Sequence, residues 1–573
     1  MTDDKLLSKS TKGVSFLILQ QFFTKILTFV MNNLLIRYLS PKVFGIMAFL
    51  TFLHDTCLFF SREAIRICIL RISNVSEKDE TEEKKKDMLN IENISKNNLQ
   101  SIINFSYVPL IIGVPLSSIL FVWQYNKINL YFKSLPYFQL SIFILWVSII
   151  MELCAEFFYN LNQYLLNYNT RSKFEGMSLT LGNLVNFLTI YFTINAKATI
   201  SEEGVAILGF SLGKLAFSSI LLGLYYIDYQ KNFKPYNKFS LLLTIIKPEH
   251  EDDGVNNIYN SKKKTYYFNE EILTHFKKVY FQMCFKHLLT EGDKLIINSL
   301  CSIEEQGIYS LLANYGSLIT RILFQPIEET TRLFLTKVFS STTSSFTSQK
   351  NFSKQTLTLS FQVISNIIKG YLYLSILILI FGPINSSYLL KFLIGSKWSS
   401  TTVLETIRTY CCYLPLLSMN GILEAFFQSV ASGDEIVKQS YMMMALSAVF
   451  MTNCYVFIKI YNLSLEGLIL SNGISMVLRI TYCTVFISHF YRKNLPSELV
   501  SSHTVKQLFN LKHIRNIGIV SMFFWLFVYT CVGKFTHNFK QLLLNVVIAL
   551  VLVLLMCYNE RKLIMSLLHK EKK

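Results

Sequence analysis

The sequence predicts an all-α polytopic membrane protein of about 14 transmembrane helices, with two pseudo-symmetric six-helix bundles around a central cavity and two further C-terminal helices. Three observations predict it: composition, the spacing of the apolar stretches and a weak internal repeat. Of the 573 residues, 51% are hydrophobic and 16% are charged, against about 25% charged in soluble domains. A membrane-spanning helix needs about 20 mostly apolar residues, and the chain has about 14 such stretches. A soluble enzyme and a single-pass receptor are therefore excluded.

The predicted spans follow these apolar stretches along the chain. They cover residues 14–36, 43–61, 99–123, 137–158, 174–195, 204–227, 279–300, 307–330, 358–381, 401–427, 440–459, 464–488, 515–533 and 537–557. The longest polar stretch separates the sixth span from the seventh. We predict an N-terminal bundle at 1–229, a cytosolic linker loop at 230–275, a C-terminal bundle at 276–490, and two additional helices with a cytosolic tail at 491–573.

The two halves of the chain resemble each other weakly at a nearly constant offset. VFGIMAFLTF around Gly45 matches EQGIYSLLAN around Gly307, and EEGVAIL around Gly204 matches LEGLILS around Gly467. AEFFYN around Glu156 matches LEAFFQ around Glu424. Six predicted spans separate the matched elements. The halves would therefore point the same way across the membrane, as in transporters built from parallel repeats.

The distribution of basic residues predicts how the chain lies in the membrane. The net charge is +18, from 55 Lys and Arg against 37 Asp and Glu. With a cytosolic N-terminus, the predicted cytosolic segments hold 36 basic residues and the opposite loops hold 8. Because basic loops stay on the cytosolic side, we predict an even number of spans and two cytosolic termini. The same rule explains the basic charge without a nucleic-acid partner.

Three common motifs of nucleotide, metal and redox sites are missing from the sequence. It has no GxxxxGK[ST] phosphate loop, no HExxH and no CxxC pattern. We therefore predict no catalytic residues, no metal ligands and no cofactor. An intramembrane glycosyltransferase would rest only on the Asp252–Asp253 pair of the linker loop, and such a pair is usually plain loop charge.

Cationic residues inside the predicted spans form the candidate binding site. A charge at mid-bilayer costs about 2.5–3.5 kcal/mol, so it faces a partner or a wet cavity. The predicted topology puts Arg62, Arg66, Arg321 and Arg332 toward the cytosolic end, Lys25, Lys286 and Lys294 near the middle, and Arg37 at the far surface. Such a series suits an anionic group that crosses the bilayer, because arginine offers two parallel donors to a phosphate.

Carboxylates accompany these cations. The residues expected to pair with them in the empty cavity are Glu63, Glu291, Asp293 and Glu328. For Glu152, Glu156, Glu424 and Arg479, ion pairs that lock the bundle are the alternative to a place in the cavity. His287 is interpreted as a hydrogen-bonded core residue, on one helical face with Glu291 and Lys294. Another face is predicted to carry Arg321, Gln325, Glu328 and Arg332, with a kink at Pro326.

Long stretches of the chain resemble one protein family. They are NNLLIRYLSPKVFGIMAFL, LFFSREAIR, FKKVYFQMCFKHLLTEGDKLIINSL, QGIYSLLANYGSLITRILFQPIEE, LIGSKWS and NGILEAFFQSVASGD. They look like the Rft family, the oligosaccharide-lipid translocation proteins of the endoplasmic reticulum, and the resemblance covers nearly the whole chain. It implies the fold of the superfamily that includes multidrug-and-toxin extruders and bacterial lipid-precursor flippases.

The resemblance implies a flippase of the endoplasmic reticulum membrane and not an enzyme. It would move dolichyl diphosphate carrying five mannoses and two N-acetylglucosamines from the cytosolic to the luminal leaflet for protein N-glycosylation. Its partners would be this lipid, the membrane and enzymes of the dolichol pathway. Our hypothesis is that the cytosolic-end arginines capture the diphosphate, the mid-depth lysines hold it and Arg37 receives it.

Two other functions stay open at this point. One is a non-transporting accessory or scaffold protein of dolichol-linked oligosaccharide biosynthesis, which would bind the diphosphate without moving it. The other is an exporter of a different substrate with the same architecture. An exporter of organic cations would need a cavity rich in unpaired carboxylates, whereas the candidates here are at least as basic as acidic.

Overall fold

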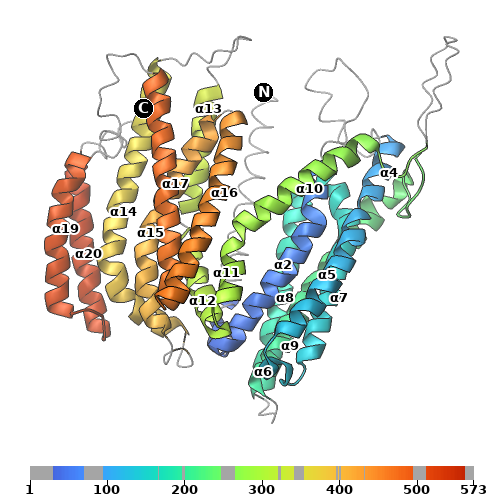
Figure 1. The fold of residues 1–573 in the computed structure, drawn as a ribbon, viewed down its shortest axis with the longest axis horizontal. Helices are drawn as coiled ribbons and strands as arrows, with labels where there is room; N and C mark the ends of the chain where they lie inside the picture. The colour runs from blue at the N-terminus through green and yellow to red at the C-terminus, as the bar shows by residue number, and fades with distance from the viewer. Residues whose placement is uncertain are drawn as a thin grey trace. The chain divides into compact units, whose positions relative to one another are not determined.

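The chain is almost entirely helical wherever its structure is described. The computed structural model describes residues 30–31, 33–69, 95–165, 167–195, 201–246, 265–320, 324–340, 354–394, 398, 402–431, 433–494 and 511–561. Among these, one isolated antiparallel bridge joins Ile246 and Tyr266. The chain forms two compact units, Met1–Glu291 and Gly292–Lys573, whose helices are labelled in Figure 1.

Ten of the described helices are long and apolar enough to cross a membrane. They are Pro41–Ile69, Lys96–Lys127, Phe138–Tyr164, Glu202–Tyr236, Gln355–Ile394, Val403–Val430, Glu435–Ile460, Ser464–Asn494, Arg515–Val532 and Phe539–Asn559. Each coincides with a predicted span. The predicted span at 174–195 is covered by α8 (Tyr168–Asn195), which is more polar, and the span at 14–36 lies mostly outside the described residues.

Two predicted spans are each divided between two helices, so the prediction of a continuous helix was wrong there. The span at 99–123 is α4 (Lys96–Phe105) and α5 (Val108–Lys127). The span at 279–300 is α10 (Glu270–Thr290) and α11 (Gly292–Leu300), which are separated at Glu291. Glycine is a poor helix former, which favours an interruption at Gly292. His287, Glu291 and Lys294 therefore do not lie along one helix.

The span predicted at 307–330 contains α12 (Ile303–Ile319) and α13 (Gln325–Ser340). Thr320 and Phe324, between these helices, are π-helical, and residues 321–323 lie outside the described residues. Pro326 is the second residue of α13. The kink predicted at Pro326 therefore stays a prediction.

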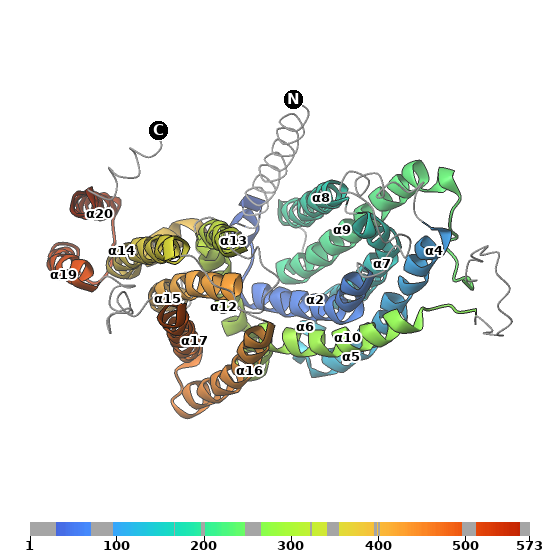
Figure 2. The same cartoon turned by 90° about the horizontal axis from the view of Figure 1, so that it is seen from above.

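The first unit contains the helices that surround the candidate site. They are α2 (Pro41–Ile69), α4 (Lys96–Phe105), α5 (Val108–Lys127), α6 (Leu130–Lys133), α7 (Phe138–Tyr164), α8, α9 (Glu202–Asn232) and α10. Helix α2 packs against α5, α7 and α10, while α9 packs against α7 and α8. Figure 2 shows this arrangement from above.

Helices α8 and α9 approach closely through two glycines. A Cβ atom added to Gly213 would lie 2.8 Å from the carbonyl oxygen of Gly182 and 2.8 Å from Cβ of Asn186. Small residues let the backbones of membrane helices come together in this way. The contact fixes the part of α9 that lines the candidate site.

Two amide side chains of α4 hold the described start of the predicted linker loop. Gln100 donates to the carbonyl oxygens of Ser240 (3.2 Å) and Leu242 (3.1 Å). Asn104 donates to those of Thr244 (2.7 Å) and Tyr267 (2.8 Å). Both side chains are buried. Hydrogen bonds from these side chains to backbone carbonyl oxygens therefore attach the described parts of the predicted loop to α4.

The second unit contains α11 to α13, α14 (Lys354–Ile394), α15 (Val403–Val430), α16 (Gly433–Tyr455), a π-helical turn (Val456–Ile460), α17 (Ser464–Asn494), α19 (Leu511–Val532) and α20 (Phe539–Asn559). Helices α19 and α20 lie side by side against α14 (Figures 1 and 2). Lys369 of α14 pairs with Glu560 at 3.0 Å. Asn545 of α20 donates to Asn385 of α14 at 2.7 Å.

Corresponding contacts in the two units support the internal repeat. Helices α9 and α17 each have 31 residues, with Gly204 and Gly467 in their first turns. Ser40, before α2, donates to Glu203 of α9 at 3.1 Å. In the second unit, Ser464 of α17 donates to Glu305 of α12. A serine–glutamate hydrogen bond therefore joins α2 to α9 in the first unit and joins the corresponding helices, α12 and α17, in the second. The serine is on the α2 side in the first unit and on the α17 side in the second.

Substitution of Gly213 tests the α8–α9 contact. Gly213→Ala is expected to destabilise the protein by about 1–3 kcal/mol. The new methyl group would overlap the backbone of α8, which cannot move away as a flexible side chain could. Gly223→Ala, on the same helix, is the control, since its Cβ would meet nothing within 4 Å. Thermal unfolding of the purified variants in detergent measures both. Equal unfolding temperatures for the two variants would contradict the predicted contact.

Candidate functional site

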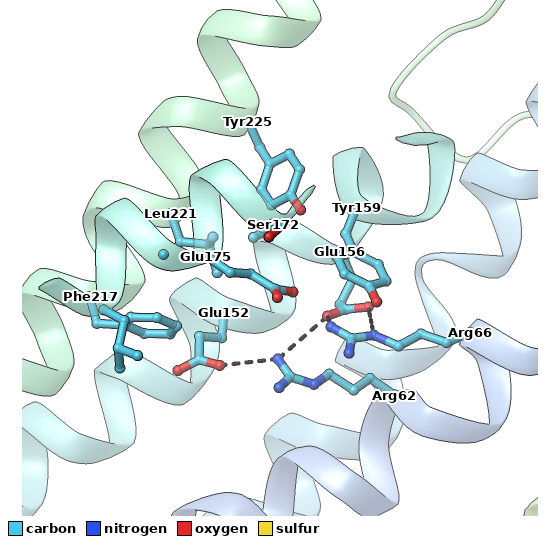
Figure 3. Close-up of a pocket in the computed structure, with 13 residues that line it drawn as sticks. Arg62, Arg66, Glu152, Glu156, Tyr159, Ser172, Glu175, Phe217, Leu221 and Tyr225 are labelled. Atoms are coloured by element: carbon cyan, nitrogen blue, oxygen red, sulfur yellow. Dashed lines mark hydrogen bonds and ion pairs between the residues drawn. The ribbon is translucent and has the colours of Figure 1, made fainter. Parts of the chain in front are cut away.

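Two arginines of α2 meet two glutamates of α7 inside the first unit. Arg62 Nη1 donates to Glu152 Oε2 at 3.0 Å and lies 3.5 Å from Glu156 Oε1. Arg66 Nε donates to Glu156 Oε2 at 3.0 Å, and its Nη2 donates to the other oxygen of the same carboxylate. Each pair of residues is spaced i, i+4, so both members face the neighbouring helix. Figure 3 shows the resulting network.

Further groups fix the position of Arg66. Its Nη1 donates to Glu63 at 3.2 Å, as the sequence analysis expected for Glu63. Its guanidinium carbon lies 3.7 Å from the centre of the Tyr159 ring, and that of Arg171 lies 4.8 Å from the same ring. Arginine stacks well on aromatic faces. Arg66 is therefore held by two carboxylates and a ring.

This network forms one wall of a cavity of about 480 Å³. The cavity lies within the first unit, between α2, α7, α8 and α9, and Figure 3 shows its lining. Polar and charged lining residues are Arg62, Arg66, Glu152, Glu156, Tyr159, Ser172, Glu175 and Tyr225. The others are Ala155, Gly176, Leu179, Phe217 and Leu221. Its volume falls in the range of small-molecule sites, about 300–1,000 Å³.

The electrostatics of the cavity are balanced. The side chains of Glu152 and Glu156 are 3% and 2% exposed, and those of Arg62 and Arg66 are 19% and 12% exposed. A buried charge without a partner is strongly destabilising. Both alternatives from the sequence therefore hold for these glutamates, which form interhelical ion pairs and also line a cavity. An anion that binds both arginines would compete with these carboxylates for the guanidinium N–H donors.

Glu152 has a second set of partners that the sequence analysis did not identify. Its Oε1 accepts from Ser218 of α9 at 3.2 Å and lies 3.5 Å from Nε2 of His54. His54 also faces Asp55, which pairs with Lys214 of α9 at 3.7 Å. The sequence does contain an indication of this role, because His54 continues the i, i+4 series of Arg62 and Arg66 along α2.

The second unit has a smaller polar cavity between α13 and α15, of about 270 Å³. Its lining residues are Gln325, Glu328, Glu329, Arg332, Gly421, Glu424, Ala425 and Gln428. Arg332 Nη1 donates to Gln428 at 3.2 Å, and Gln428 donates to Glu424 at 3.2 Å. The carboxylate of Glu328 lies against Gly421, where a Cβ would overlap it.

The two cavities have the same spacing but different charges. Arg62 and Arg66 face Glu152 and Glu156, whereas Glu328 and Arg332 stand one helical turn apart beside Asn420, Glu424 and Gln428. A glutamate therefore replaces the first arginine of the pair, and the second cavity is the more acidic. Within the described residues, Glu424 and Arg479 form no ion pair.

Of the remaining predicted site residues, Arg37, Glu291 and Lys294 have described side chains, and none of the three lines either cavity. Arg37 is exposed in the turn before α2, and Lys294 is exposed on α11. Glu291 lies between α10 and α11, Lys286 belongs to α10 and Asp293 to α11. Lys25 and Arg321 lie outside the described residues. The series of cations across the membrane therefore stays a prediction.

His287 has the role predicted for it. It is 8% exposed, its Nε2 lies 3.3 Å from Thr56 Oγ1, and its ring stacks on Phe59. A second local pattern is also structural. Residues Gly209 to Gly213 read GxSxG, the pattern of a nucleophilic serine, but Ser211 is fully buried inside α9 and donates to the carbonyl oxygen of Ile207.

Comparison with solved structures defines the class of protein. A structure described as "Lipid II flippase MurJ, inward closed conformation" matches with a TM-score of 0.60 and 14% identity, over 96% of this chain and 99% of that chain. This likeness shows the fold. The chain is a multi-pass membrane protein with the fold of this flippase, as the sequence predicted.

Sequence comparison then gives the family. The family model "Rft-1: Rft protein" matches residues 9–570. The "Man(5)GlcNAc(2)-PP-dolichol translocation protein RFT1" of Saccharomyces cerevisiae is 49% identical over 99% of this chain and 97% of its own length. The protein of the same name from Eremothecium gossypii is 49% identical over 100% and 98%. The chain belongs to the Rft family, a family of translocation proteins and not of enzymes.

Removal of Glu156 tests the arginine–carboxylate network. Glu156→Gln is expected to destabilise the protein by roughly 3 kcal/mol, because two buried guanidinium groups lose a shared carboxylate. Glu63→Gln is the matched control and should cost less than about 1 kcal/mol, since the Glu63 side chain is 34% exposed and contacts the network from its edge. Chemical unfolding in detergent measures both. Equal losses of unfolding free energy in the two variants would contradict the central place of Glu156 in the network.

Proposed function

We propose that this protein translocates Man5GlcNAc2-PP-dolichol across the membrane of the endoplasmic reticulum. The observation that carries the proposal is 49% identity, over essentially the full length of both chains, to two proteins named for this activity. The fold of a lipid flippase agrees with it. The lipid would be delivered for protein N-glycosylation, with the enzymes of the dolichol pathway as neighbours.

The cavity of the first unit is the site we propose for the diphosphate. Arg66 can present two N–H donors to phosphate oxygens, in the geometry in which it now holds Glu156. Arg62 can present its Nη1, which now holds Glu152. The diphosphate would take the places of the Glu152 and Glu156 carboxylates. A cavity of about 480 Å³ holds the diphosphate with the adjoining sugar and not the whole oligosaccharide. The dolichol tail would stay in the lipid.

The other cations are proposed to act along the path of the head group. Arg321 and Arg332 would take part in capture, Lys286, Lys294 and Lys25 in holding the diphosphate near mid-depth, and Arg37 in its release. The carboxylates of Glu63, Glu291, Asp293 and Glu328 would compensate these cations in the empty protein. A polar head group cannot cross hydrocarbon without such partners, because each unpaired polar group costs several kcal/mol.

We also propose that both termini face the cytosol. The basic excess of the predicted cytosolic segments supports this orientation. An epitope added after Lys573 should be removed when protease is applied to sealed microsomes. An epitope that survives until detergent is added would place the C-terminus in the lumen and contradict the proposal.

Translocation by the purified protein is the direct test of the function. In liposomes with labelled Man5GlcNAc2-PP-dolichol, the wild-type protein should accelerate head-group movement. The double variant Arg66→Gln/Glu156→Gln should slow it at least about tenfold, because it keeps a neutral hydrogen-bonded pair and removes a charged donor to phosphate. Lys42→Ala is the control, since Lys42 is an exposed cation on the same helix.

The outcomes separate the candidate functions. Movement by the wild type that the double variant leaves unchanged would remove Arg66 from the path while keeping the function. Tight binding of the lipid with no movement would favour the non-transporting accessory role. Movement of unrelated organic cations in its place would favour an exporter of the same architecture.

A further inference from the structure

A buried histidine of α2 lies between two carboxylates. His54 is 1% exposed, its Nδ1 lies 3.1 Å from Asp55 Oδ1, and its Nε2 lies 3.5 Å from Glu152 Oε1. A neutral imidazole carries a single N–H and can donate to one of these oxygens, whereas an imidazolium carries two and can donate to both. The surroundings of His54 therefore suit a ring that gains a proton.

The charged groups around His54 come from three helices. Asp55 and Arg62 belong to α2, Glu152 to α7 and Lys214 to α9. Helix α10 contributes His287, which turns to Thr56. Helices α4 and α5 carry their charged residues only at their ends, Lys96 and Lys127. Two carboxylates thus face His54 directly, and one of them, Asp55, is also paired with a lysine.

Glu152 joins this histidine to the arginine cavity through its two oxygens. Oε2 accepts from Arg62, while Oε1 faces Ser218 and His54. If an anion binds Arg62 in place of Glu152, the neighbours that remain to Glu152 are the hydroxyl of Ser218 and the imidazole of His54. A buried carboxylate needs a compensating positive charge, and histidine is the side chain that gains a proton most readily near neutral pH.

We propose that His54 and Glu152 form a proton-binding site that is coupled to occupancy of the arginine cavity. When Arg62 and Arg66 bind the diphosphate, one proton from water binds at the His54–Glu152 pair. When the diphosphate leaves, the arginines return to the carboxylates and the proton is released. The inference rests on the proposed function, because it takes the diphosphate as the anion, and it adds the ion whose binding accompanies translocation.

The test uses the full-length protein in lipid nanodiscs, with farnesyl diphosphate as the probe. Calorimetric titrations in two buffers of different ionisation enthalpy give the number of protons taken up per probe bound. The phosphates of the probe also titrate near neutral pH, so the informative quantity is the difference between wild type and His54→Gln. We expect the variant to take up fewer protons, by up to about one per probe, and its Kd to change less between about pH 6 and about pH 8.

A second histidine of the same unit provides the matched control. His287 is also buried, but its Nε2 faces the Thr56 hydroxyl and not a carboxylate. His287→Gln should keep the wild-type proton uptake. Glu152→Gln should lose it as His54→Gln does, because the buried carboxylate whose charge the proton compensates is gone. It also serves as a second probe of the site if His54→Gln fails to fold.

Each result decides something different. Equal proton uptake by wild type and His54→Gln, with the probe bound by both, would overturn the proton site and leave the proposed function standing. Loss of uptake in His287→Gln to the same degree would also overturn it, since any buried histidine would then produce the effect. Failure of the wild type to bind the probe at all would overturn both the diphosphate site and its coupled proton.

Discussion

The first unit depends on one electrostatic constraint: two arginines buried in a helix bundle must each meet a carboxylate. Arg62 and Arg66 lie one helical turn apart, and so do Glu152 and Glu156. Matching turns fix the register of α2 on α7, and the close approach of α8 to α9 completes the cavity. The same pairing makes the cavity sensitive to a bound anion. An anion that binds the arginines releases the carboxylates, which then need new partners.

The second unit shows how a repeat can keep its geometry and change its chemistry. Glu328 stands where the spacing would place an arginine, and Arg332 reaches a glutamine and not a glutamate. The described lining of this cavity has no donor pair like that of Arg62 and Arg66, so the two cavities differ in the groups they offer to an anion. Duplication preserved the helices, as the serine–glutamate bonds at α9 and α17 indicate, while single substitutions separated the roles of the two sites.

Much of the fold could be predicted because span length and hydropathy are local properties. Helices α2, α7, α9, α14 to α17, α19 and α20 fall where the apolar stretches are. The breaks between α4 and α5 and at Glu291 were missed, because the average hydropathy of a span hides a local interruption. In the site, the i, i+4 spacing found Arg62, Arg66, Glu152 and Glu156 but could not choose their partners. The roles of His54, Lys214 and Tyr159 depend on which helices are neighbours, and sequence periodicity does not contain that information.

The central claim is that a diphosphate replaces the carboxylates on Arg62 and Arg66. A cryo-electron microscopy structure of the protein with Man5GlcNAc2-PP-dolichol tests it most directly. The account predicts phosphate oxygens within hydrogen-bond distance of both guanidinium groups, with Glu152 and Glu156 moved from the positions they hold here. A bound lipid whose diphosphate lies elsewhere, with the four side chains still paired, would contradict the account.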